Sequence, residues 1–80
     1  MAENSLVPER PALDLKLRTL PAKPGVYIMK DVSGRIVYVG KAVSLRNRVR
    51  SYFHAPHSHP PKVQRLVAEV ADIDYIVAGS

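Results

Sequence analysis

The chain has 80 residues, enough for one small domain and near the size at which a single hydrophobic core becomes marginal. Twelve lysines and arginines against seven aspartates and glutamates give a formal net charge of +5, which favours a polyanionic partner such as nucleic acid. The lack of cysteine excludes disulfides and fits a reducing cytoplasm, and the sequence shows neither a membrane span nor a secretory signal.

The N-terminal part of the chain is polar and contains two prolines, which predicts a disordered tail over 1–11 and one domain over 12–80. The leucines between residues 12 and 20 fit either a strand with alternating side chains or a helix with one apolar face. The composition of this segment favours the helix, because leucine, lysine, arginine and alanine are good helix formers.

A β-hairpin is predicted next, because residues 26–30 and 35–41 are rich in β-branched and aromatic residues and flank a turn-forming segment over 31–34. We expect a four-residue loop, since a three-residue loop would mix aliphatic and aromatic faces. In this register Tyr27 lies directly opposite Tyr38, with Cβ atoms roughly 4.5–5.5 Å apart. The aliphatic face then consists of Val26, Ile28, Val37 and Val39, and the other face of Tyr27, Met29, Ile36 and Tyr38.

A helix is predicted after the hairpin, with Ser44 as its N-cap. Its apolar stripe comprises Leu45, Val49, Tyr52 and Phe53. At about 100° per residue, Arg46 and Arg50 fall on one flank of this stripe, and Arg48 falls on the other. Lys41 ends the preceding strand and is expected near Arg48.

The remaining segments predict a helix over 62–71 and a third strand over 72–78, separated from the first part by a loop broken by prolines. Three histidines on this loop, His54, His57 and His59, lack the spacing of a helical metal pair, so we do not expect a metal site there. The expected fold is α+β: a small three-stranded antiparallel sheet flanked by helices.

The two tyrosine segments and the arginine-rich helix together resemble the GIY-YIG nuclease domain, and most closely the form found at the N-terminus of the UvrC excision-repair family. Arg48 follows Tyr38 by ten residues, and the resemblance extends from about residue 13 to the end. The residues that carry it are Leu20-Pro21, Pro24-Gly25-Val26-Tyr27, Tyr38-Val39-Gly40-Lys41-Ala42, Leu45-Arg46, Arg48-Val49-Arg50-Ser51-Tyr52-Phe53 and Ala71-Asp72-Ile73-Asp74.

This resemblance implies hydrolysis of a DNA phosphodiester by water with one divalent cation, Mg²⁺ or Mn²⁺. One of Tyr27 and Tyr38 would activate the water and the other would orient it; we favour Tyr27 as the base, although the residues leave the choice open. The planar guanidinium of Arg48 would stabilise negative charge on the phosphate. Lys41 would bind phosphate or a tyrosine.

The resemblance also implies contacts with damaged double-stranded DNA and action with UvrA and UvrB on the 3′ side of a lesion, in the bacterial cytoplasm. Arg46 and Arg50 are expected to contact backbone phosphates, Tyr52 to lie near the scissile phosphate, and Asn47 to be a further DNA contact. We expect the domain to be a monomer.

The family's metal-binding glutamate lies on a helix after the third strand, and the sequence ends at Ser80, where that helix is expected to begin. We therefore expect a truncated domain whose metal ligand comes after Ser80. Three alternatives follow: a DNA-binding fragment without activity, another GIY-YIG endonuclease, and a protein-interaction domain. The last predicts little salt dependence of DNA binding, whereas phosphate contacts predict a steep one.

Overall fold

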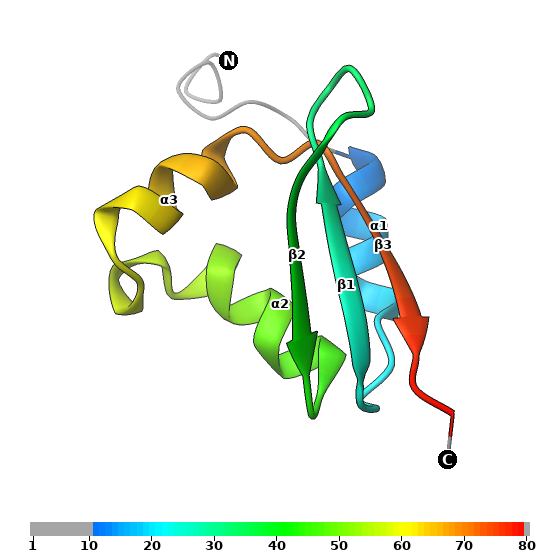
Figure 1. Ribbon diagram of the computed structural model, residues 1–80. Helices are drawn as coiled ribbons and strands as arrows, with labels where there is room; N and C mark the ends of the chain where they lie inside the picture. The colour runs from blue at the N-terminus through cyan, green and yellow to red at the C-terminus, as the bar shows by residue number, and fades with distance from the viewer. Residues whose placement is uncertain (1–10, 80) are drawn as a thin grey trace.

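The computed structural model describes residues 11–79 and has the predicted α+β architecture (Figure 1). Three strands form one antiparallel sheet in the order β2-β1-β3, so the first strand lies in the middle. Figure 1 shows α1 behind β1 and β3, with α3 farthest from the sheet. The elements are α1 (Pro11–Thr19), β1 (Gly25–Lys30), β2 (Ile36–Ala42), α2 (Leu45–His54), the 3₁₀ turn η2 (Pro56–Ser58), α3 (Pro61–Ala68) and β3 (Asp72–Val77).

The hairpin loop is shorter than expected. The amide of Asp31 donates to the carbonyl of Arg35, which leaves a three-residue loop over 32–34. The Asp31 carboxylate accepts from the amides of Ser33 and Arg35, and Gly34 has a positive φ of 88°. A type I turn followed by a left-handed glycine is a common three-residue hairpin loop, so this local chemistry outweighed the pattern that favoured four residues.

An extra residue in β2 then places Tyr27 and Tyr38 on the same face of the sheet, as expected. Lys30 pairs with Ile36 and Met29 pairs with Tyr38, so Val37 has no partner on β1 and forms a bulge. The expected direct opposition of Tyr27 and Tyr38 is therefore wrong, although both side chains lie on the same face. The predicted places of two neighbours are also wrong, because Val37 packs against the core and Ile36 is 55% exposed.

The helices agree with the predictions within a few residues. The ambiguous N-terminal segment is helix α1, which begins at Pro11; the rest of the predicted tail lies outside the described residues. Ser44 caps α2, since its side chain accepts from the amide of Asn47. The last helix ends earlier than expected, at Ala68.

The core is one cluster between the helices and a single face of the sheet. It combines α1, α2 and the end of α3 with alternate residues of β1, of which Tyr27 and Met29 are buried. Since one cluster contains all of these side chains, α1 and α2 cover the same face. The buried residues are Leu13, Leu17, Leu20, Tyr27, Met29, Leu45, Val49, Tyr52, Val67, Val70 and Ile73.

The edge strand β3 is fixed by charged groups as well as by pairing with β1. The Asp74 carboxylate contacts the amino groups of Lys30 at 2.6 Å and Lys16 at 3.1 Å, and Lys16 also contacts Asp72 at 3.0 Å. These ion pairs join β3 to both β1 and α1. Within the described residues, no helix is long and apolar enough to cross a membrane.

Candidate active site

Three tyrosines from three elements meet where α2 packs on the sheet: Tyr27 of β1, Tyr38 of β2 and Tyr52 of α2. The ring centroid of Tyr27 lies 6.1 Å from that of Tyr38 and 5.9 Å from that of Tyr52. Tyr38 and Tyr52 are 6.3 Å apart, edge to face. These separations are typical of favourable aromatic pairs. The two expected catalytic tyrosines are thus brought together, with Tyr52 as the third member.

The ring of Tyr27 lies across β2 over a glycine, and this brings its hydroxyl to the tyrosine cluster. Gly40 is its direct partner in the β1–β2 pair, and the phenol lies where a side chain at position 40 would project. The second glycine of the resemblance therefore leaves room for the ring of a buried tyrosine.

A hydrogen bond of 2.7 Å joins the hydroxyls of Tyr27 and Tyr52. Both side chains are buried, and this bond satisfies polar atoms that water does not reach. Burial, followed by the bond to Tyr52, raises the pKa of Tyr27 far above its ordinary value, while nearby Arg48 lowers it slightly. Tyr27 is consequently a neutral phenol at physiological pH. Tyr38, by contrast, is 38% exposed.

Arg48 lines an open depression formed by α2, the end of β2 and the connection between them. Its volume is about 350 Å³. The Arg48 charge is close enough to Tyr27 to act on its pKa. Arg48 is exposed and forms no ion pair with any residue in the described part of the chain, so its guanidinium is available to an anion. The lining residues are Ala42, Val43, Ser44, Asn47, Arg48 and Ser51.

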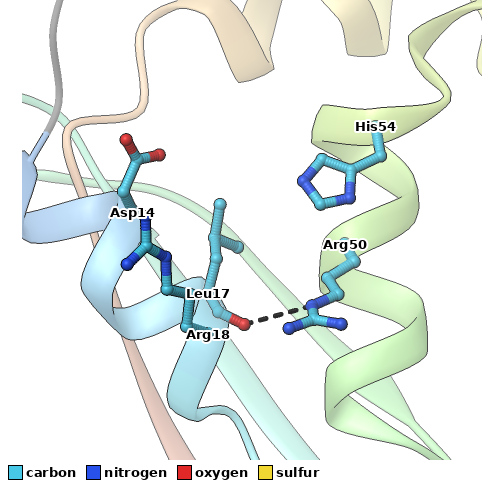
Figure 2. Close-up of a pocket in the computed structure, with 5 residues that line it drawn as sticks. All are labelled: Asp14, Leu17, Arg18, Arg50 and His54. Carbon is cyan, nitrogen blue, oxygen red and sulfur yellow. Dashed lines mark hydrogen bonds between the residues drawn. The ribbon is translucent and has the colours of Figure 1, made fainter.

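The other two arginines of α2 lie on the opposite flank and bind the end of α1. The Nε of Arg46 donates to the carbonyl of Leu20 at 2.9 Å, and the Nε of Arg50 donates to that of Leu17 at 3.2 Å. Figure 2 shows the Arg50 contact in a second pocket of about 250 Å³ between α1 and α2. Each arginine therefore has a structural bond, which sequence spacing could not show. The pocket residues are Asp14, Leu17, Arg18, Arg50 and His54.

Lys41 is separated from the tyrosine face. It pairs with Val26, and successive strand residues alternate sides, so Lys41 and Gly40 project to opposite faces of the sheet. Its exposed side chain lies at the end of β2, next to the connection that leads to Arg48.

The histidine loop supplies a residue that the sequence did not single out as part of this site. The His59 ring stacks on Tyr52 with centroids 4.4 Å apart and planes 21° apart. Among residues 11–79, no three histidine, aspartate or glutamate side chains form a group that could hold a metal ion. The tyrosine site therefore lacks, on its own, the carboxylate ligands that a hard divalent cation prefers.

An antiparallel three-stranded sheet with two strand tyrosines beside a helix arginine defines the class of GIY-YIG nuclease domains. Residues 23–80 match the UvrC-like GIY-YIG domain, and the chain belongs to this family.

Curated relatives agree with this assignment. The chain is 57% identical to UvrABC system protein C of Ruminiclostridium cellulolyticum over 65 residues, which cover 81% of this chain and 11% of that protein. It is 44% identical to the Acaryochloris marina protein of the same name over 80 residues, or 100% of this chain and 13% of that protein. The chain thus spans about a tenth of the length of the curated relatives it matches.

A solved structure shows the same fold. The GIY-YIG N-terminal endonuclease domain of UvrC from Thermotoga maritima, bound to magnesium as its catalytic divalent cation, superposes with a TM-score of 0.69 at 37% identity. The match covers 84% of this chain and 71% of that domain. Variants of that domain with one tyrosine replaced by phenylalanine were also solved with the catalytic cation bound.

Proposed function

We propose that the chain is the tyrosine- and arginine-bearing part of a DNA endonuclease domain that acts in nucleotide excision repair. The observation that carries this proposal is the cluster of Tyr27, Tyr38 and Tyr52 beside Arg48, whose guanidinium forms no ion pair within residues 11–79. The Thermotoga variants support it, because two of the substituted tyrosines there are separated by as many residues as Tyr38 and Tyr52 here.

We assign contact with the attacking water to Tyr38. Its phenol is the one of the three that is open to solvent, whereas burial keeps Tyr27 neutral. This assignment replaces our preference for Tyr27 as the base. In the proposed site, Tyr27 and Tyr52 form a buried hydrogen-bonded pair against which the ring of Tyr38 packs, so that its hydroxyl has a defined position.

Arg48 is the group we assign to the phosphate. Attack of water on phosphorus adds negative charge to the phosphate oxygens, and a guanidinium can bind two of them at once. The depression around Arg48 is open, so a phosphodiester in an extended strand can enter it. A divalent cation would supply Lewis-acid stabilisation of the leaving oxygen; the described residues do not form its site.

The proposed substrate is damaged double-stranded DNA, cut on the 3′ side of a lesion together with UvrA and UvrB. The relatives support this, since they belong to the UvrABC system. Asn47 lines the depression, so we assign it to a phosphate contact near the cut. Lys41 is exposed next to the last residue of β2 and projects from the other face of the sheet, so we assign it to a phosphate farther along the strand. The terminal nitrogens of Arg46 and Arg50 would contact phosphates on the far flank of α2, and Tyr52 would act through its tyrosine neighbours.

The test is cleavage of a lesion-containing duplex with Mg²⁺ or Mn²⁺. This chain is compared with a version extended to the length of the solved Thermotoga domain, each with Arg48→Ala. Arg65→Ala is the control, because Arg65 is exposed on α3. We expect cleavage by the extended form, a decrease of roughly 10²–10³-fold with Arg48→Ala, and little change with the control.

Other outcomes decide between the proposals. Undiminished cleavage by Arg48→Ala would contradict the assigned role of this residue. Equal cleavage by the short chain would show that residues 1–80 suffice for metal use. Steeply salt-dependent DNA binding without cleavage by either form favours a DNA-binding fragment.

A further inference from the structure

We infer that His59 is a positioning residue for the tyrosine cluster: it holds Tyr52, and through Tyr52 it holds Tyr27. The contact joins the loop after α2 to the candidate active site by a stack of two aromatic rings, 4.4 Å between centroids and 21° between planes. The expected effect of His59 on cleavage rests on the proposed function. Its expected effect on the positions of Tyr52 and Tyr27 does not.

The backbone of His59 is fixed on both sides. Its amide donates to the carbonyl of Pro56 at 3.1 Å, which closes η2, and its carbonyl accepts from the side chain of Gln64 at 2.8 Å. The loop is therefore anchored to the first turns of α3. An anchored backbone reduces the entropy lost when the side chain is ordered, so the ring can serve as a fixed support.

A hydrogen bond at the edge of the imidazole ring of His59 also fixes its orientation. Its Nε2 lies 3.3 Å from Oγ of Ser51, which precedes Tyr52 on α2. Ser51 in turn donates to the carbonyl of Arg48 at 2.7 Å. The histidine ring thus contacts Tyr52 by stacking and the neighbouring residue by a hydrogen bond, and both contacts are made with the helix that bears Arg48.

Support of Tyr52 matters because its hydroxyl is the hydrogen-bond partner of the buried Tyr27 hydroxyl. A rotation of the Tyr52 ring would break this buried bond and leave a buried hydroxyl without a partner, which is unfavourable. His59 stacks on one face of the Tyr52 ring and so opposes that rotation. The stack explains why Tyr52 is only 7% exposed although it lies near the end of α2.

The first test uses this chain with ¹³C at Cζ of tyrosine, observed by NMR. His59→Ala is compared with His59→Phe, which retains a stacking ring, and with His57→Ala, an exposed histidine of the same loop. We expect His59→Ala to shift the Tyr27 and Tyr52 signals. His59→Phe should restore most of this shift, and His57→Ala should not produce it.

The second test measures cleavage by the extended domain with the same substitutions, at a temperature where each variant is folded. We expect His59→Ala to lower kcat about tenfold or more with KM little changed, since a misplacement of about 1 Å can cost up to 10²-fold. His59→Phe should recover most of the rate. Unchanged Tyr27 and Tyr52 signals in His59→Ala would overturn the inference, as would a failure of His59→Phe to restore them.

The two tests separate this inference from the proposed function. If no form of the domain cleaves DNA, the endonuclease proposal fails while the NMR result still decides the role of His59. If His59→Ala shifts the tyrosine signals but leaves the cleavage rate unchanged, His59 supports the fold alone. Its role in positioning the tyrosines for cleavage is then rejected.

Discussion

The phenol of Tyr27 occupies the space that a side chain at its strand partner Gly40 would fill, on the face of the sheet that packs against the helices. The hydroxyl of Tyr27 reaches Tyr52 because nothing projects from the backbone at Gly40. The backbone at Gly40 does not have a positive φ, so this glycine is required for space and not for conformation.

Gly40→Ala should accordingly destabilise the fold. The added methyl group would meet the phenol of Tyr27, which is buried and hydrogen-bonded to Tyr52. Overpacking of this kind costs about 1–3 kcal/mol. Urea denaturation measures the change, and Gly79→Ala is the matched control, because a Cβ at Gly79 meets no atom within 4 Å. Equal stability of the two variants would show that the ring of Tyr27 does not occupy this space.

The hydrogen bond between Tyr27 and Tyr52 should appear as coupling in a double-mutant cycle. Removal of either hydroxyl leaves the other without its buried partner, so Tyr27→Phe and Tyr52→Phe should each cost about 1 kcal/mol. The double variant should cost less than the sum of the two. Tyr75→Phe serves as a control, since Tyr75 is exposed on β3. Strict additivity would indicate that the two hydroxyls do not interact in solution.

Asp74 should stabilise the edge of the sheet in a pH-dependent way. The hydrogen bond from Lys30, followed by that from Lys16, lowers the pKa of Asp74 below its ordinary value. Its contribution is therefore present above the unfolded pKa of about 3.9 and is lost as pH falls through the lower folded value. Because the carboxylate is 44% exposed, the contribution is below about 1 kcal/mol.

Asp74→Asn tests this expectation by urea denaturation at pH 7 and at low pH. The variant should be less stable than the parent chain at pH 7, and the difference should shrink on acidification. Glu69→Gln, an exposed acid that forms no ion pair with a described residue, should show no such trend. A difference that grows on acidification would contradict the sign derived from the pKa.

Substitution of Arg48 should lower activity and substitution of Arg50 should lower stability, although the two residues are only two positions apart. Arg50→Ala removes a bond to the carbonyl of Leu17 and should lower the free energy of unfolding by about 1 kcal/mol. Arg48→Ala should leave stability nearly unchanged, because its guanidinium forms no ion pair with a described residue, and should abolish most cleavage. Denaturation and cleavage assays on the same two variants compare these effects, and a reversed ranking would contradict both assignments.

Much of the fold follows from local chemistry that the sequence displays. The cap at Ser44 depends on one side chain and its own helix, and the α2 stripe contains Leu45 and Val49, both of which are buried. Such short-range features are predictable because the interacting groups are close in the chain.

Other features depend on contacts that no local pattern contains. The bulge at Val37 shifts the hairpin register by one residue, and a pattern of alternating side chains cannot reveal an unpaired residue. The stack of His59 on Tyr52 depends on where the loop returns after η2. The bonds from Arg46 and Arg50 require the position of α1, which spacing along α2 does not give.

The strand order also has a consequence for synthesis on the ribosome. All three clustered tyrosines leave the ribosome before β3, yet β3 pairs with one whole edge of the central strand β1. Until residues 72–77 emerge, the backbone groups on that edge of β1 have no strand partner. Such an edge is a template for pairing with another chain. A nascent polypeptide arrested before Asp72 would therefore carry the chemical groups of the site together with an open edge prone to aggregation.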